Sequence, residues 1–288
     1  MIRFRGSSGL DLNILNIKTE GNCNLIIQIF VYWDFDKQEK QVNQLVMKTI
    51  LITLIIMAMN APVYSQDLPE VDRISTSAGD VELFFVGHGS LMLRTGDFVI
   101  HIDPVKSSGK YDKLPKADLI LVTHEHGDHL DTDLIGTLRK PETVMFCNGA
   151  SASKVSWAQV MKPGDVKTTG NITIEAVPAY NIVNERSKGQ PFHPKGTGNG
   201  YILKIGDKKF YIAGDTENTP EMKALKGIDV AFLPMNLPYT MTPEMVADAA
   251  RAFGPKILYP YHFGETKTDQ LTGLLKGSGI EVRIRSLK

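Results

Sequence analysis

Residues 123–129 read Thr-His-Glu-His-Gly-Asp-His, and residues 118–122 directly before them read Asp-Leu-Ile-Leu-Val. An apolar run that is rich in branched side chains and ends in a polar turn is typical of a buried β-strand. The polar residues then lie on a loop at the C-terminal end of that strand, where α/β folds place their chemistry. The segment therefore predicts an α/β protein with a functional site at this edge of a sheet.

The same loop holds three of the seven histidines of the chain, together with two acidic residues. Neutral imidazole and carboxylate are preferred ligands of zinc and similar cations. His124 and His126 flank a single residue and can converge on one ion. Asp128 and His129 follow Gly127, which lets the backbone bend, and they can reach a second ion beside the first. The loop therefore predicts a metal site with two ions.

The pattern His124-x-His126-x-Asp128-His129 after an apolar strand resembles the signature loop of the metallo-β-lactamase-fold hydrolases. The order of the motifs extends the resemblance from Val81 to the C-terminus. Within the family, the chain resembles the subgroup that contains the ascorbate-6-phosphate lactonase. This resemblance implies an α/β fold, the αββα four-layer sandwich, with two mixed β-sheets and helices on the outer faces. The chain also shows two similar halves, each with strands followed by helices. The further stretches that carry the resemblance are Gly87–Ser90, Ile102–Pro104, Ala213–Thr216 and Tyr261–Gly264.

The resemblance also implies the remaining metal ligands. Asp215 would bridge the two ions, although an Asp-Thr pair can instead cap a following helix. His262 would complete the second site. The family places a histidine directly after a strand as third ligand of the first ion, but this chain has Asn181 at that place. We carry the role to His193; the alternative is an oxygen, a water or no third ligand.

Several further residues are candidates for roles around the metals. Asp103 either starts a turn or accepts a hydrogen bond from a ligand histidine and fixes its tautomer, and the resemblance favours the second role. His88 is either a turn residue or a pocket residue, and with Asp128 it is our candidate for a catalytic side chain. Loop positions suggest five substrate-binding candidates, which are Tyr180, Asn181, Lys195, Asn236 and Tyr239.

Periodicity and turn signals along residues 81–288 predict the secondary structure. Residues 66–80 are polar, and we expect a loose leader there. Residues 178–199 are rich in Gly, Pro and Lys and predict a long irregular loop, which in a compact domain is usually functional. Cys147 lies in a strand-like run, where a buried structural thiol is expected. Helices are expected at 131–139, around 151–158, from Pro220, at 242–253 and at 268–276.

The composition limits the class of partner. The chain has 288 residues, and its formal net charge is zero. A chain of this length can bury a core without disulfides, and a zero net charge indicates no basic nucleic-acid surface. We therefore expect a small-molecule substrate and no nucleic acid, and the sequence does not predict an oligomeric state.

Residues 47–65 have the features of a secretory signal peptide, with a lysine, a short apolar core and a small residue before a cleavage site. Since a signal peptide begins a chain, we expect residues 1–46 to be a non-native upstream extension. Residues 66–288 would then be the mature hydrolase domain, periplasmic or secreted after cleavage near Ser65-Gln66, with no stable membrane anchor. The alternative is an internal anchor or a buried element.

These features predict a binuclear metal-dependent hydrolase. A water between two cations loses a proton near neutral pH because its pKa falls from about 15.7 to about 7, and the bridging hydroxide attacks the substrate. The ions are expected to be Zn²⁺, with Mn²⁺ or Fe²⁺ as alternatives. A lactone or another ester-like compound is the expected substrate. Two alternatives stay open, a phosphodiesterase of the same fold and a metal-binding protein without catalysis.

Overall fold

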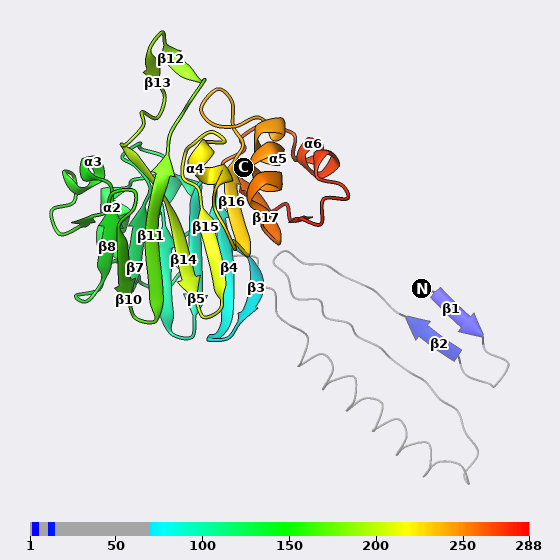
Figure 1. Cartoon of the computed structure of the whole chain (residues 1–288). Coiled ribbons are helices and arrows are strands. Elements are labelled where there is room, and N and C mark those ends of the chain that lie inside the picture. The colour runs from blue at the N-terminus through cyan, green and yellow to red at the C-terminus, as the bar shows by residue number, and fades with distance from the viewer. Residues whose placement is uncertain (1, 6–10, 15–68, 288) are drawn as a thin grey trace. The chain divides into compact units, whose positions relative to one another are not determined.

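The structure of the protein is a computed structural model that describes residues 2–5, 11–14 and 69–287 (Figure 1). The chain divides into two units, Met1–Ser65 and Gln66–Lys288. The described part of the first unit is an antiparallel pair of strands, β1 (Ile2–Arg5) and β2 (Asp11–Ile14).

The predicted signal peptide, residues 47–65, lies outside the described residues. The expected start at Met47 and the expected export therefore stay predictions. Within the part of the chain that the structure describes, no helix has the length and apolar character needed to cross a bilayer.

Two seven-stranded mixed sheets form the body of the second unit (Figure 1). The first sheet has the order β3-β4-β5-β6-β7-β8-β9 and the second the order β10-β11-β14-β15-β16-β17-β18. In each sheet the first three pairs of neighbouring strands are antiparallel, and the last three pairs are parallel. This repetition confirms the two similar halves that the sequence indicates.

The strands of the first sheet are β3 (Glu70–Thr76), β4 (Gly79–Gly87), β5 (Ser90–Thr95), β6 (Phe98–Ile102), β7 (Leu119–Val122), β8 (Val144–Cys147) and β9 (Gln159–Val160). Those of the second are β10 (Val166–Thr169), β11 (Ile172–Ala179), β14 (Gly198–Ile205), β15 (Lys208–Ile212), β16 (Val230–Pro234), β17 (Ile257–Tyr261) and β18 (Glu281–Val282). The described helices are η1 (Lys106–Ser108), α2 (Thr132–Leu138), α3 (Gly149–Ala152), α4 (Pro220–Lys223), α5 (Pro243–Phe253) and α6 (Thr268–Leu274).

Alternating side chains explain how four layers form. In β7, Leu119 and Leu121 belong to the main core, whereas Ile120 and Val122 belong to a second cluster that includes Ile135 of α2. Successive residues of a strand point to opposite faces, so β7 packs against the other sheet with one face and against helices with the other.

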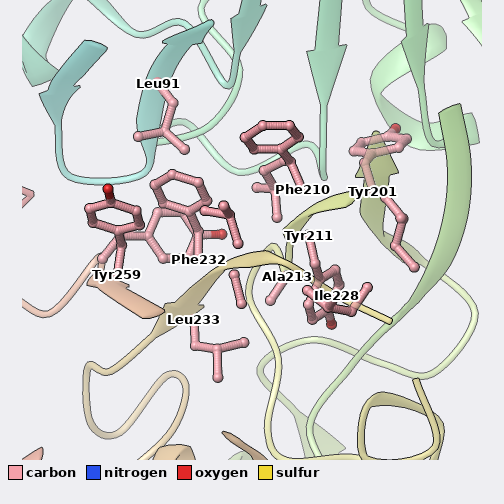
Figure 2. Close-up of a cluster of buried hydrophobic side chains, with 14 of the residues drawn as sticks. Leu91, Tyr201, Phe210, Tyr211, Ala213, Ile228, Phe232, Leu233 and Tyr259 are labelled. Carbon is pink, nitrogen blue, oxygen red and sulfur yellow. The ribbon is translucent and has the colours of Figure 1, made fainter. Parts of the chain in front are cut away.

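The second sheet follows the same rule. Phe232 of β16 points toward Leu91 of the first sheet, and Leu233 points to the opposite side (Figure 2). On the outer side, Phe253 of α5 meets the ring of Tyr211 with centroids 6.0 Å apart. Both faces of both sheets are thus covered, and the predicted αββα sandwich is confirmed.

Helix starts follow the predicted chemistry. The Asp131 side chain accepts a hydrogen bond from the backbone N–H of Leu134 and caps α2. Thr242 does the same for Met245 at the start of α5, with Pro243 in the first turn. Such caps satisfy backbone donors that the helix leaves free.

Two expectations about local structure are wrong. Residues 70–76 form the edge strand β3 rather than a loose leader, and β3 pairs along its length with β4. Its polarity misled the prediction because only Ile74 is buried on this strand. The long segment 178–199 is not wholly irregular either, since it contains the end of β11 and a small hairpin of β12 (Glu185–Ser187) and β13 (Gln190–Pro191).

Candidate metal centre

Histidines and carboxylates gather where several strands end. Parallel strands present their C-terminal ends at one edge of a sheet, so loops that are distant in sequence meet there. These residues are His88 after β4, Asp103 after β6, residues 124–129 after β7, Asp215 after β15 and His262 after β17.

His124, His126 and His193 form the first group, with potential ligand atoms all within 4.8 Å of one another. His124 Nε2 and His126 Nδ1 lie 3.0 Å apart. The His193 ring centroid lies 5.0 Å from each of the other two rings. The structure thus brings His193 to the place where the sequence analysis expects a third ligand for the first ion.

Asp128, His129 and His262 form the second group. Asp128 Oδ2 lies 3.4 Å from His262 Nε2 and 3.8 Å from His129 Nε2. The rings of His129 and His262 are stacked with centroids 5.2 Å apart. All three side chains that the signature loop and the last motif assign to a second ion are therefore together.

Asp215 lies between the two groups. Its Oδ2 atom is 3.3 Å from His193 Nε2 and 3.6 Å from His262 Nε2. Its Oδ1 atom is 3.4 Å from His129 Nε2. One carboxylate thus faces imidazoles of both groups, which is the arrangement expected of a bridging ligand, and the alternative role as a helix cap falls to Thr219.

The spacing and bonding of these atoms fit metal ions. Ligand atoms around a tetrahedral ion with bonds of about 2.1 Å are roughly 3.4 Å apart, close to most of the separations above. Two of the atoms, His129 Nε2 and Asp215 Oδ1, are buried without a hydrogen-bond partner. Buried polar atoms are normally satisfied, and a cation would satisfy both.

The protonation of the site also suits cation binding. Burial lowers the pKa of His193 to about 4 and that of His124 well below its usual value. Both imidazoles are therefore neutral near pH 7, with a lone pair available to a metal. Burial alone would also lower the pKa of His129, but the carboxylates of Asp215 and Asp103 outweigh it and hold this pKa well above its ordinary value. Positive charge is thus favoured at this point of the site.

Asp103 lies behind His129. Its Oδ2 atom is 2.8 Å from His129 Nδ1, and both side chains are fully buried. The backbone N–H and the hydroxyl of Thr123 donate to the same carboxylate, each at 2.7 Å. This contact directs His129 Nε2 toward Asp215 and agrees with the role that the resemblance implies for Asp103.

Asn181 supports His193 rather than replacing the expected histidine. Its Oδ1 atom accepts the backbone N–H of His193 at 2.7 Å and lies 2.8 Å from His193 Nδ1. The second contact fixes Nδ1 as the protonated nitrogen and leaves Nε2 toward Asp215. Asn181 is therefore a partner of a ligand candidate, although the sequence analysis also considered it for substrate binding.

Glu217 is a site residue that the sequence analysis missed. It is fully buried, and its carboxylate accepts the backbone N–H groups of Ile182, Val183 and Asn184 at 2.7–3.0 Å. It also accepts from the Asn181 side chain at 3.1 Å. The only sequence signal was its place two residues after Asp215, since its partners are mostly backbone groups far away in the chain.

His88 faces the second group. Its Nε2 atom is 3.3 Å from Asp128 Oδ2, and its ring centroid is 3.8 Å from that of His262. Its side chain is partly exposed. Burial would raise the pKa of Asp128, but hydrogen bonding to His262 and His88 outweighs it and lowers this pKa. His88 thus lies next to the metal candidates, lines a separate hollow together with Asp128, and occupies a turn.

The other substrate-binding candidates differ in position. Tyr180 donates its hydroxyl to Glu221 at 2.8 Å, and Lys195 pairs with the same carboxylate at 2.8 Å. The ring of Tyr239 packs against Phe192 with centroids 5.1 Å apart, and Phe192 lines a cavity together with His124, His126, His193 and Asp215. Tyr239 is exposed and is therefore separated from the cavity by the ring of Phe192.

Asn236 lies in the same loop as Tyr239. Its backbone carbonyl accepts the N–H groups of Tyr239 and Thr240 at 3.0 and 2.8 Å. Its backbone N–H donates to Thr240 Oγ1 at 2.8 Å. These contacts hold the loop in shape, and they involve its backbone rather than the cavity.

This fold and this cluster of metal-ligand side chains define a class of protein, the metallo-β-lactamase-fold hydrolases. The family described as beta-lactamase superfamily domain matches residues 82–262. The chain belongs to this superfamily.

Proteins that are similar to this chain carry consistent names. A metal-dependent hydrolase of Anaeromyxobacter dehalogenans is 29% identical over 236 residues, which are 72% of this chain and 84% of the relative. One from Thermococcus kodakarensis is 33% identical over 196 residues, covering 64% and 84%. A crystal structure of a protein from Parabacteroides distasonis, assigned as a metal-dependent hydrolase, has a TM-score of 0.73 and 50% identity, covering 76% of this chain and 99% of that one.

The metallo hydrolase Igni18 of Ignicoccus hospitalis shares the fold, with a TM-score of 0.60 at 23% identity and with 72% and 95% of the two chains covered. Taken with the site, these relatives identify the chain as a metal-dependent hydrolase. The resemblance to the lactonase-like subgroup stays a prediction.

Proposed function

We propose that the chain binds two divalent cations, with Zn²⁺ as the first candidate, and hydrolyses a small lactone or ester-like substrate. His124, His126 and His193 would hold one ion, and Asp128, His129 and His262 the other. The observation that carries the proposal is the position of Asp215, whose two oxygens face imidazoles of both groups at 3.3–3.9 Å.

The bound ions would supply an acidified water molecule as nucleophile and positive charge for the oxyanion that forms. The protein supplies orientation. Asp103 and Asn181 each fix one imidazole through Nδ1, at 2.8 Å in both cases. Such partners hold ligands in productive geometry before the substrate arrives.

His88 is our candidate for proton transfer to the leaving group. It is partly exposed, lies 3.3 Å from Asp128 Oδ2, and forms a cluster with Asp128 and His262. An imidazole is suited to this role because one of its ring nitrogens can donate a proton and the other can accept one. Its place beside Asp128 is consistent with the catalytic role expected for both residues.

The first test is metal content per chain after gentle purification of the full chain, measured by elemental analysis. We expect close to two ions per chain, and zinc-loaded protein should hydrolyse γ-butyrolactone or 4-nitrophenyl butanoate. Bis(4-nitrophenyl) phosphate is the comparison substrate. Faster turnover of the phosphodiester would overturn the ester assignment, and a chain that holds no more than one ion would overturn the two-ion site. Asp97→Asn, at an exposed turn, serves as control.

A further inference from the structure

We propose that an apolar rim beside the metal centre binds an apolar acyl or aryl part of the substrate. The apolar rim consists of Ile182, Val183, Phe192, Leu237 and Tyr239. This proposal rests on the proposed function for the reaction itself and adds the kind of substrate that the site accepts.

Exposed large apolar side chains concentrate on the two loops of the rim. Among the described residues, eight large hydrophobic side chains are exposed, and four of them belong to the rim. Val183 is 71% exposed, Ile182 51%, Leu237 50% and Tyr239 44%. The other four lie on separate elements, β3, β9, β10 and the segment after β18. A cluster of this kind, unlike single exposed side chains, marks a binding surface.

The rim is continuous with the metal cavity. Phe192 lines that cavity together with the three histidines of the first group and Asp215. On its other side, the Phe192 ring contacts Tyr239 edge-to-face at 5.1 Å. A molecule with its reacting group in the cavity therefore meets Phe192 first and then Tyr239. This continuity is the reason for assigning the rim to the substrate rather than to another protein.

The two loops are joined to each other. The Asn181 side chain donates to Tyr239 O at 2.9 Å, and the Asn184 side chain donates to Thr240 O at 2.8 Å. The loop with Ile182 and Val183 and the loop with Leu237 and Tyr239 thus form one surface.

The loop with Ile182 and Val183 is also held from beneath. Glu217 accepts three consecutive backbone N–H groups, those of residues 182–184. Both apolar side chains are therefore presented to solvent by a backbone that is fixed by a buried carboxylate. A preorganised apolar surface binds an apolar group without the cost of ordering the loop.

The test measures binding of product-like carboxylates to the zinc-loaded full chain by titration calorimetry. Butanoate and octanoate share the carboxylate and differ by four methylene groups. We expect octanoate to bind about 10-fold more tightly, since a fully buried methylene contributes up to about 4-fold and the rim is open on one side. In Val183→Ser/Leu237→Ser this ratio should fall to about 3-fold or less.

The matched control is Val160→Ser/Val166→Ser, which removes two exposed valines from β9 and β10. We expect it to keep the 10-fold ratio. Equal binding of butanoate and octanoate by the wild type, or an equal loss in both double variants, would overturn the rim. A wild-type dimer that Val183→Ser/Leu237→Ser converts to a monomer in analytical ultracentrifugation would also overturn it, in favour of a contact between two copies.

Hydrolysis of 4-nitrophenyl butanoate and 4-nitrophenyl octanoate separates the rim from the reaction. A chain-length effect on binding with no hydrolysis of either ester would leave the rim standing and would contradict the proposed ester hydrolysis. Hydrolysis of both esters with equal kcat/KM, together with equal carboxylate binding, would support the hydrolase and overturn the rim.

Discussion

Asp103 and Asp215 occupy equivalent places in the two halves of the molecule and have opposite surroundings. Asp103 follows β6 and Asp215 follows β15, and each of these strands pairs antiparallel on one side and parallel on the other. Both side chains are almost fully buried, with exposures of 0% and 4%. Asp103 lies against two donor groups of Thr123 and the ring of His129, whereas Asp215 Oδ1 has no hydrogen-bond partner.

The difference shows what each half contributes. The carboxylate of Asp103 is stabilised by donors of its own chain and needs nothing further. Asp215 faces four imidazole nitrogens. Burial would raise its pKa, but the charges of His262 and His129 outweigh burial and lower it, so this carboxylate is balanced by groups that are themselves metal-ligand candidates. The same topology thus places a carboxylate that is hydrogen-bonded within the chain, Asp103, in one half and a carboxylate that can bind a cation, Asp215, in the other.

Asp215→Asn should have the largest effect. The amide cannot bridge two cations, so we expect both ions to be lost and activity to disappear. Affinity for metal should fall by more than about 100-fold, because even residues that only support a ligand are worth 10–100-fold. Elemental analysis and a zinc-competition titration measure this loss.

The stability of Asp215→Asn sharpens the comparison. In the presence of a chelator, the variant should unfold at a temperature close to that of the wild type, since the substitution removes the desolvation cost of the carboxylate together with its attraction to the imidazoles. Full zinc content in the variant would contradict the bridging role. Asp97→Asn, at the exposed β5–β6 turn, is the control for the substitution itself.

Asp103→Asn should destabilise the fold whether or not metal is present. The amide offers one acceptor atom to three neighbouring groups, and its N–H₂ then faces another donor. Breaking a buried interaction of this kind costs about 3 kcal/mol, which urea unfolding with and without chelator can measure. If the loss appeared only in metal-loaded protein, Asp103 would act through the metal alone, and the contrast with Asp215 would fail.

The sequence predicted the position of the signature loop for a physical reason, whereas the family resemblance implied the four-layer fold and the remaining ligand candidates. The signature loop follows β7, whose apolar residues are buried on both faces, and a strand of that kind fixes where its loop emerges. His262 follows β17 in the same way. The local pattern thus indicated the ligands of the signature loop, and the family resemblance supplied the roles of Asp215 and His262.

What the sequence could not predict depends on backbone contacts across long distances. The Glu217 carboxylate binds N–H groups of residues 182–184, and no side-chain pattern records such partners. The strand β3 was missed because an edge strand with one buried side chain has no apolar alternation. The role of Asn181 behind His193 was missed because the hairpin β12–β13 lies between them in the chain.

Asn181→Ala tests that supporting layer and should have a smaller effect than the two aspartates. It removes the partner of His193 Nδ1, and we expect affinity for one of the two ions to fall about 10-fold to 100-fold. Asn184→Ala is the matched control. Asn184 lies in the same loop as Asn181, and its side chain donates to Thr240 O without contacting His193. Sequential zinc titration of both variants separates the ions. Equal weakening by the two substitutions would mean that the loop, and not the contact with His193, sets the affinity.

Asp72→Asn should have the smallest effect and adds a third kind of aspartate to the comparison. Asp72 on β3 is paired with Arg285 at 2.8 Å and Arg283 at 3.2 Å and accepts the Tyr259 hydroxyl at 2.5 Å. Its charge is therefore balanced by cations of the chain itself. Burial would raise the pKa of Asp72, but the bonds from Tyr259 and Arg285 and the charges of both arginines outweigh it and lower this pKa.

A carboxyl group whose pKa is lower in the folded state stabilises the fold above its unfolded pKa of about 3.9, and this contribution is lost as the pH falls through the folded value. We therefore expect Asp72→Asn to cost about 1–2 kcal/mol at pH 7, and the difference from wild type should shrink as the pH falls below about 4. Urea unfolding of both proteins from pH 7 to pH 3 measures it. A difference that stays constant over this range would mean that packing, rather than the charge of Asp72, holds β3 to the segment after β18. Asp215→Asn should behave differently in the same experiment, because the stabilising effect of Asp215, unlike that of Asp72, depends on added zinc.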